Sequence, residues 1–251
     1  MSVLENRIAI ITGSSSGIGA GVAEAFATEG ATVIINYPDE SELQNAQNTL
    51  NKIIHLSPQS QIIQANVSSE DEVISMINEI NSIHGTIDIL VNNAGIATSA
   101  PVHEMTSSMW DELISIHLKG TFLCTREVLK IMYKKNYGKI INTASQLAYK
   151  GSAGFSHYTA AKGAILSFTR SLSLEIGSKN IRANCVAPGA TETRMLADVP
   201  IEILNDIKSD IPKGELANVS DIVPSYVFLA SDAANHFVGH SLSPNGGDVF
   251  L

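Results

Sequence analysis

A tyrosine and a lysine four residues apart, Tyr158 and Lys162, are well suited to proton transfer. If this segment is helical, both side chains lie on one face, because residues i and i+4 are neighbours on a helix surface. A phenol has a pKa near ~10, and a nearby cation favours the phenolate, so we expect Lys162 to lower the pKa of Tyr158. The alternative is a packed tyrosine ring beside a lysine that extends to water. The pair therefore predicts a proton donor for a carbonyl group, and the rest of the chain must decide.

A glycine-rich segment, residues 12–19, follows the apolar run 7–11 directly. The run predicts a buried strand, and the helical spacing of apolar residues beyond the glycines predicts a helix. Gly13 can adopt the positive φ of the turn, Gly17 lets a phosphate approach the backbone, and Gly19 lets the helix lie close to the strand. Free amides at the start of the helix can then bind an anion. The glycine spacing matches neither G-x-G-x-x-G nor a P-loop, so alone it is weak support for nucleotide binding.

Apolar runs alternate with helical patterns along the whole chain, without a repeat or a low-complexity linker. The expected strands cover residues 7–11, 32–36, 61–65, 87–92, 139–143, 182–187 and 241–244. This alternation predicts an α/β fold, a doubly wound (Rossmann-type) parallel sheet of about seven strands with helices on both faces. With 251 residues, 44% of them hydrophobic, we expect a single domain, residues 1–251.

Composition argues against several classes of protein. The 25 acidic residues outnumber the 16 basic ones and give a net charge of −9, which disfavours a nucleic-acid surface. No run of about eighteen apolar residues predicts a membrane span, and residues 1–7 lack the features of a signal peptide, so we expect a cytoplasmic protein. Cys124 and Cys185 fit buried thiols, and no cluster with metal-ligand spacing occurs, so we expect no metal.

Several motifs, taken together and in order, resemble those of the short-chain dehydrogenase/reductase family. They are the segment 12–19 (cofactor turn), Asn92–Gly95 (end of the fourth strand), Ser145 with Tyr158 and Lys162 (active site), and Pro188, Gly189 and Thr193 (after the sixth strand). The similarity extends from about residue 7 to residue 247. It is greatest to the compact single-domain branch, whose members resemble 3-oxoacyl reductases or polyol and sugar dehydrogenases. Ordered motifs are much less often coincidental than single ones.

The resemblance implies an NAD(P)-dependent oxidoreductase that transfers a hydride between nicotinamide and a carbonyl or secondary alcohol. It implies that Tyr158 is the general acid or base, that Ser145 donates a hydrogen bond to the substrate oxygen, and that Lys162 holds the nicotinamide ribose. The cofactor-binding residues that it implies are Gly13, Ser15, Ser16, Gly17, Ile18, Gly19, Tyr37, Asn66, Val67, Asn93, Ala94, Gly95, Tyr158, Lys162, Pro188, Gly189, Thr191 and Thr193. The alternative is a cofactor-binding sensor or scaffold protein that has lost turnover.

His117 departs from the family pattern, because an asparagine usually stands at this position. The resemblance implies that this residue holds a water in the proton relay to Lys162. An imidazole can also donate and accept hydrogen bonds, but it is bulkier and can be charged near neutral pH. We therefore expect His117 to be the fourth catalytic residue, with a satisfied core histidine as the alternative.

Two sites in this family decide between NAD and NADP: the residues after the second strand and the residue before Gly17. Here they are residues 36–40, Asn-Tyr-Pro-Asp-Glu, and Ser16, so no cation is available at either site. Asp39 and Glu40 would repel a ribose phosphate, but neither stands at the usual acidic position, which Tyr37 occupies. We therefore favour NAD over NADP. Asn66 replaces an aspartate that commonly meets the adenine, and its amide oxygen can still accept a hydrogen bond.

The sequence specifies the substrate and the assembly less closely. A substrate loop is expected at about residues 192–218, either as an amphipathic lid or as ordinary helices on the core. A cluster of lysines, Lys130, Lys134, Lys135 and Lys179, fits a landing patch for an acidic acyl carrier or a solvated helix end. Apolar faces on the helical patterns 108–135 and 153–177, and the C-terminus near Phe250 and Leu251, predict a homotetramer. The residues on those faces are Phe122, Leu123, Val128, Leu129, Ile165, Leu166, Phe168, Leu172 and Leu174.

Overall fold

The structure is a computed structural model that describes residues 2–197 and 199–250, and in these residues seven parallel strands form one sheet. The strands are β1 (Ile8–Ile11), β2 (Thr32–Tyr37), β3 (Gln61–Gln64), β4 (Ile89–Asn92), β5 (Gly138–Thr143), β6 (Ile181–Val186) and β7 (Ser241–Leu242). Their order across the sheet is β3-β2-β1-β4-β5-β6-β7. The predicted doubly wound parallel sheet is confirmed, with each strand end within two residues of its expected position.

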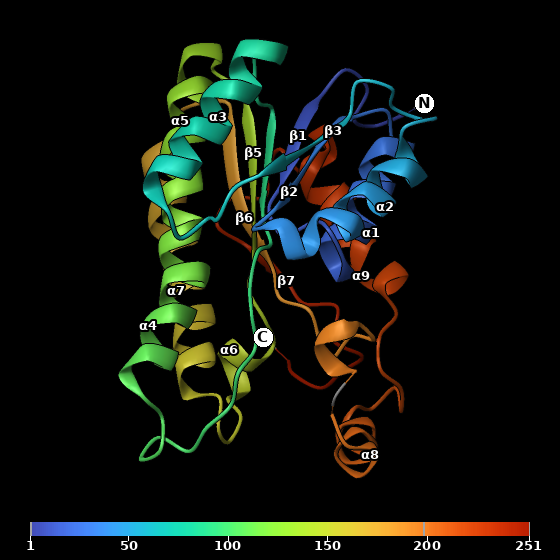
Figure 1. Cartoon of the computed structure of the whole chain (residues 1–251), viewed down its shortest axis with the longest axis vertical. Coiled ribbons are helices and arrows are strands. Elements are labelled where there is room, and N and C mark those ends of the chain that lie inside the picture. The colour runs from blue at the N-terminus through green and yellow to red at the C-terminus, as the bar shows by residue number, and fades with distance from the viewer. Residues whose placement is uncertain (1, 198, 251) are drawn as a thin grey trace.

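Helices cover both faces of the sheet (Figure 1). The α-helices are α1 (Gly17–Thr28), α2 (Leu43–Ile53), α3 (Glu70–His84), α4 (Ser107–Ile114), α5 (Gly120–Lys135), α6 (Leu147–Lys150), α7 (Ser156–Ile176), α8 (Ile201–Asp210) and α9 (Val219–Ala230). Short 3₁₀ segments are η1 (Glu40–Glu42), η3 (Arg194–Leu196) and η4 (Asp232–Ala234). In Figure 1, α1, α2 and α9 lie on one side of the strands and α3, α5 and α7 on the other. None of the helices described is long and apolar enough to span a bilayer.

The two faces of the sheet have separate cores. Ile11 of β1 packs with Phe26 and Tyr226 on the α1 and α9 side, whereas its neighbour Ile10 packs with Leu123 on the α5 side. This alternation follows from the two-residue period of a strand, and both faces are apolar because both are covered. The sequence of the central strands therefore consists of continuous apolar runs.

The order of the strands reverses at β1, which lies between β2 and β4. In an open parallel sheet a ligand binds beyond the carboxyl ends of the strands at such a point. The glycine turn after β1 and residues 93–95 after β4 meet there. Figure 1 shows α6 and α8 beyond this end of the sheet and the N-terminus at the opposite end.

The helical pattern predicted over residues 108–135 is interrupted. A π-helical segment, η2 (Ser115–Lys119), separates α4 from α5, and the Gly120 N–H donates to the Ser115 carbonyl five residues earlier. His117 lies within this segment and contacts Ile96 in the chain that follows β4. Gly120 is close to Val67, because a Cβ at Gly120 would lie 2.8 Å from a methyl carbon of Val67. Isolated π-turns of this kind are frequent at functional sites.

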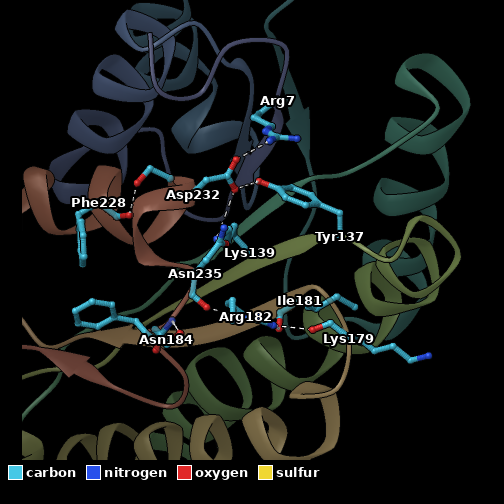
Figure 2. Close-up of polar contacts among 12 residues, drawn as sticks. Arg7, Tyr137, Lys139, Lys179, Ile181, Arg182, Asn184, Phe228, Asp232 and Asn235 are labelled. Carbon is cyan, nitrogen blue, oxygen red and sulfur yellow. Dashed lines mark hydrogen bonds and ion pairs between the residues drawn. The ribbon is translucent and has the colours of Figure 1, made fainter. Parts of the chain in front are cut away.

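A polar cluster joins the opposite end of the sheet to η4 (Figure 2). The Asp232 carboxylate accepts hydrogen bonds from Arg7 at 3.3 Å and from the Tyr137 hydroxyl at 3.1 Å. The Lys139 ammonium is 1% exposed, lies 3.9 Å from Asp232 and donates to the Asn235 side chain. Burial lowers the pKa of Lys139 to about 8. The cluster lies away from the cleft at the carboxyl ends, so we assign it a structural role.

Candidate active site

Ser145, Tyr158 and Lys162 come together at the carboxyl end of β5. The Ser145 hydroxyl accepts from the Leu147 N–H at 3.1 Å and makes a side-chain hydrogen bond with Tyr158. The Lys162 ammonium lies 5.6 Å from the centre of the Tyr158 ring, so α7 presents both residues on one face. Lys162 is buried and donates to the Thr143 carbonyl at 2.7 Å. The three residues are therefore neighbours in space, as the sequence predicts.

The structure contradicts the expectation that the pKa of Tyr158 is lowered. Burial raises the pKa of Tyr158, and the hydrogen bond from Ser145 only partly opposes that rise. Burial also lowers the pKa of Lys162 to about 7, which weakens its charge near neutral pH. Desolvation disfavours the charged form of each group, so it acts on the two pKa values in opposite directions. Tyr158 is therefore held as a neutral phenol, which is a proton donor.

His117 bonds to the backbone of the segment that follows β4. Its Nε2 lies 2.9 Å from the Ile96 nitrogen and 2.8 Å from the Ile96 carbonyl oxygen, while its buried Nδ1 has no partner in the described residues. The ring packs edge-on against Tyr158, with 5.5 Å between ring centres. Burial, followed by the charge of Lys162, lowers the pKa of His117 to about 3. A neutral imidazole thus fixes this segment beside the tyrosine, and its role in a proton relay stays a prediction.

Gly95 is required by that imidazole. A Cβ at position 95 would lie 2.4 Å from the Cε1 atom of His117 and 3.0 Å from each ring nitrogen. Such separations are far below van der Waals contact, so no larger residue fits while the ring stays in place.

The glycine turn forms a cradle whose shape fits a dinucleotide. Gly13 and Gly17 have positive φ, 61° and 58°, and a Cβ at Gly19 would lie 2.5 Å from the Gly13 carbonyl oxygen. Ser16 is the N-cap of α1, but its side chain makes no capping bond, so the first amides of the helix remain available for phosphate. Ile18, the second residue of α1, packs against the core and anchors the helix.

The chain after β4 is bonded to this turn. The Asn93 amide donates to the carbonyls of Thr12 and Gly13, both at 3.1 Å, and the Thr12 hydroxyl accepts from the backbone of Asn93 and Ala94, both at 3.0 Å. A Cβ at Gly13 would lie 2.7 Å from the Cα of Ala94. Asn93 therefore fixes the turn from the side of β4. Its neighbour Asn92 bonds to Thr125 and Asn142 inside the protein, which agrees with a structural role.

The segment after β6 lies across the same cleft. The Pro188 carbonyl accepts from the Gln146 N–H at 3.0 Å, which holds the segment beside Ser145. The Thr191 hydroxyl donates to the Gly189 carbonyl at 2.9 Å, and the methyl carbon of Thr193 would lie 3.6 Å from a Cβ at Gly17. The predicted cofactor residues of this segment therefore extend from Ser145 to the glycine turn. Asp198, within the predicted substrate loop, lies outside the described residues, as does Leu251.

Three predicted cofactor residues after β2 and β3 have local partners. Tyr37 is 7% exposed and packs in the core, so it leaves no acid at the end of β2. The Asn66 amide oxygen accepts from both the amide and the hydroxyl of Ser68, at 3.0 and 2.8 Å. A carbonyl oxygen has two lone pairs, so an adenine contact to this oxygen would require one of these bonds to break. Val67 is buried.

Sequence reasoning missed two charged residues beside the cofactor turn, Glu42 and Arg194. They form an ion pair of 2.7 Å, and Glu42 also accepts from the Ser15 hydroxyl at 2.8 Å. Neither residues 36–40 nor Ser16 supplies a cation, as the sequence shows, but Arg194 brings one to this end of the site from a distant segment. No local pattern links residues that are 152 positions apart.

The C-terminal segment is also tied to the site. The Asp248 carboxylate accepts from the Gln146 side chain at 2.6 Å and from the Lys150 ammonium at 2.6 Å. Gln146 directly follows Ser145, so this contact supports the chain next to the predicted catalytic serine. The sequence offered no signal for it beyond an acid near the end of the chain.

Comparison with known proteins agrees with this geometry. The family model described as enoyl-(acyl carrier protein) reductase matches residues 13–248. The chain is 35% identical to (2S)-[(R)-hydroxy(phenyl)methyl]succinyl-CoA dehydrogenase subunit BbsD of Thauera aromatica, over 97% of each chain. It is 36% identical to 3-oxoacyl-[acyl-carrier-protein] reductase FabG of Chlamydia trachomatis, over 98% of each chain. With the FabG of Staphylococcus aureus it shares 36% identity over 96% of this chain and 97% of the relative. The chain therefore belongs to the short-chain dehydrogenase/reductase family and is an NAD(P)-dependent oxidoreductase.

Proposed function

We propose that this protein reduces the keto group of a 3-oxoacyl thioester, with Tyr158 as the proton donor. The observation behind this proposal is the position of Tyr158, which is hydrogen-bonded to Ser145 and whose ring centre lies 5.6 Å from the Lys162 ammonium. The raised pKa of Tyr158 keeps the phenol protonated at neutral pH, which suits the direction of reduction.

The chain's residues have separate tasks in this proposal. When bound, the nicotinamide cofactor supplies the hydride. Ser145 and Tyr158 both hydrogen-bond the substrate oxygen, and Tyr158 transfers its proton as negative charge develops there. Lys162 holds the nicotinamide ribose, and the Thr143 carbonyl at the end of β5 fixes the Lys162 ammonium beside Tyr158. The cradle of Gly13, Gly17 and Gly19 would hold the pyrophosphate. All these residues belong to one domain in our proposal.

The substrate class is inferred from two relatives and from the surface of the substrate segment. The relatives' names specify acyl groups on coenzyme A and on acyl carrier protein, and both are thioesters. Met195, Ile201 and Ile203 expose 50%, 60% and 50% of their area, so this segment offers an apolar surface for an acyl chain.

Two of the four clustered lysines give little support for docking of an acidic carrier. Lys130 pairs with Glu127 and Lys135 pairs with the buried Asp88, so both cations already have acidic partners. Pairing reduces the attraction that these lysines exert on an approaching anion. We therefore propose that the acyl group, and not the carrier, dominates recognition.

We also propose NAD as the preferred cofactor and a homotetramer as the assembly. Most of the apolar residues that predicted the interface are internal, however. Leu123 and Leu172 are at most 4% exposed, whereas Phe122 and Leu174 expose 43% and 86%. The support for assembly is therefore limited to a few side chains, since an internal residue cannot contact a second copy.

Tyr158→Phe tests the central assignment. We expect kcat with acetoacetyl-coenzyme A to fall by about 10² to 10⁴, because general acid groups contribute that much, while NAD and NADP still bind. Tyr133→Phe, which alters an exposed tyrosine on α5, should leave kcat unchanged. A Tyr158→Phe variant that keeps more than about a tenth of kcat contradicts the role of Tyr158. Faster turnover of polyols, cyclic ketones or steroids than of acyl thioesters contradicts the substrate class.

A further inference from the structure

Glu42 is a partly buried carboxylate with three donors at the edge of the cofactor turn. Its side chain is 16% exposed. Glu42 is the last residue of η1, which lies between β2 and α2. One oxygen accepts from the Ser15 hydroxyl at 2.8 Å and from the Asn45 amide at 3.0 Å. The other lies 2.7 Å from the Arg194 guanidinium. Glu42 therefore connects the glycine turn, the start of α2 and the substrate segment.

This carboxylate is charged at neutral pH. Burial raises its pKa, but hydrogen bonds from Asn45, Ser15 and Arg194 together bring the pKa below its ordinary value. The two acids that the sequence singled out are placed differently. Glu40 is exposed, and Asp39 is exposed and accepts from Ser41, next to it in the loop. In the described residues neither makes a hydrogen bond or ion pair with the glycine turn, whereas Glu42 accepts from Ser15 of that turn.

Two of the three donors to Glu42 come from segments that form the glycine cradle. Ser15 lies in the glycine turn, and Arg194 follows Thr193, whose methyl carbon would lie 3.6 Å from a Cβ at Gly17. In doubly wound sheets the pyrophosphate lies on the turn after β1, and the ribose 2′-hydroxyl meets an acid beyond β2. Tyr37 cannot serve as that acid, because its ring is in the core.

We propose that Glu42 selects the cofactor, accepting from the 2′-hydroxyl of NAD and repelling the 2′-phosphate of NADP. This inference rests on the proposed function as a nicotinamide-dependent reductase. A phosphate at Ser15 would lie against a fixed carboxylate, and like charges in a partly buried site repel strongly.

Arg194 determines how complete this selection is. While it is paired with Glu42, its charge offsets part of the repulsion. Once Glu42 is neutral, the guanidinium is free to bind a ribose phosphate in bidentate fashion. The gain in NADP affinity expected from Glu42→Gln should therefore depend on Arg194.

Binding of cofactors and of fragments without nicotinamide tests the inference apart from catalysis. Dissociation constants for NAD, NADP, ADP-ribose and 2′-phospho-ADP-ribose are measured by calorimetry with the full chain. In the wild type we expect NAD to bind at least tenfold more tightly than NADP. Glu42→Gln should improve the affinity for NADP relative to NAD at least tenfold, and the fragments should follow the same order. Glu40→Gln, which removes a nearby exposed charge, should leave the ratio within about twofold, because exposed charges are screened.

The double variant Glu42→Gln/Arg194→Gln should lose most of the gain in NADP affinity. If Glu42→Gln leaves the ratio unchanged while NAD still binds, the inference is wrong and the proposed function stands. The same holds if Glu40→Gln shifts the ratio equally, since the effect would then be a general one of charge. If none of the four ligands binds the wild type, the proposed function fails together with the inference.

Discussion

A methyl group added at Gly95 should destabilise the protein through a single contact. No positive φ is involved at this position, so Gly95→Ala places no strain on the backbone. The new Cβ would lie 2.4 Å from the Cε1 atom of His117, where ordinary contact needs about 3.5 to 4.0 Å. The ring cannot easily retreat, because Ile96 holds its Nε2 and Tyr158 packs against it at 5.5 Å. Overpacking of this kind costs about 1 to 3 kcal/mol.

The partner of the clash can be removed separately. His117→Asn deletes the Cε1 atom, so Gly95→Ala in that background should cost less than about 0.5 kcal/mol, which is the usual limit for a change without a specific mechanism. The four proteins form a double-mutant cycle, measured as the free energy of unfolding in urea by circular dichroism at one protein concentration. Gly163→Ala is the matched control, because a Cβ there has no atom within 4 Å and alanine favours a helix. An equal cost of Gly95→Ala in both backgrounds would refute the reasoning.

Three further predictions concern charge and assembly. Folding lowers the pKa of His117 from 6.5 to about 3, so between these two values the unfolded chain binds a proton that the folded chain does not. As pH falls through this range, the free energy of unfolding of the wild type relative to His117→Asn should decrease by about 1.4 kcal/mol per pH unit. A difference that stays constant with pH contradicts this. Lys139→Met removes a buried ammonium whose pKa is about 8 in the folded protein. As pH rises from 8 toward 10.5, the free energy of unfolding of the wild type in urea should increase relative to that of the variant. The absence of an increase would show that Lys139 is not desolvated. Light scattering should give a tetrameric mass for the wild type and a smaller one for Leu174→Glu, whose side chain is 86% exposed on α7; a monomeric wild type argues against the proposed interface.

Much of the fold was predictable because its signals are local. The apolar runs at β1, β4 and β5 mark strands covered on both faces, and the helical spacing between them requires crossover connections. The same reasoning predicted that Tyr158 and Lys162 share a face of α7, since four residues make about one turn. It missed the π-helical segment η2, because the residues of η2 fit an α-helix equally well when considered alone.

The strands, the glycine turn and the spacing of Tyr158 and Lys162 could be predicted from the sequence, because each depends on neighbours within a few positions. The burial and the charge of these residues depend on contacts between distant segments. The pKa of Tyr158 rises because burial in the folded protein removes water from it, which outweighs the hydrogen bond from Ser145. Arg194 reaches Glu42 because the chain after β6 crosses to the glycine turn. Leu123 is internal because α3 and α5 pack together. Burial and long-range charge depend on which segments meet, and that information is spread over the whole chain.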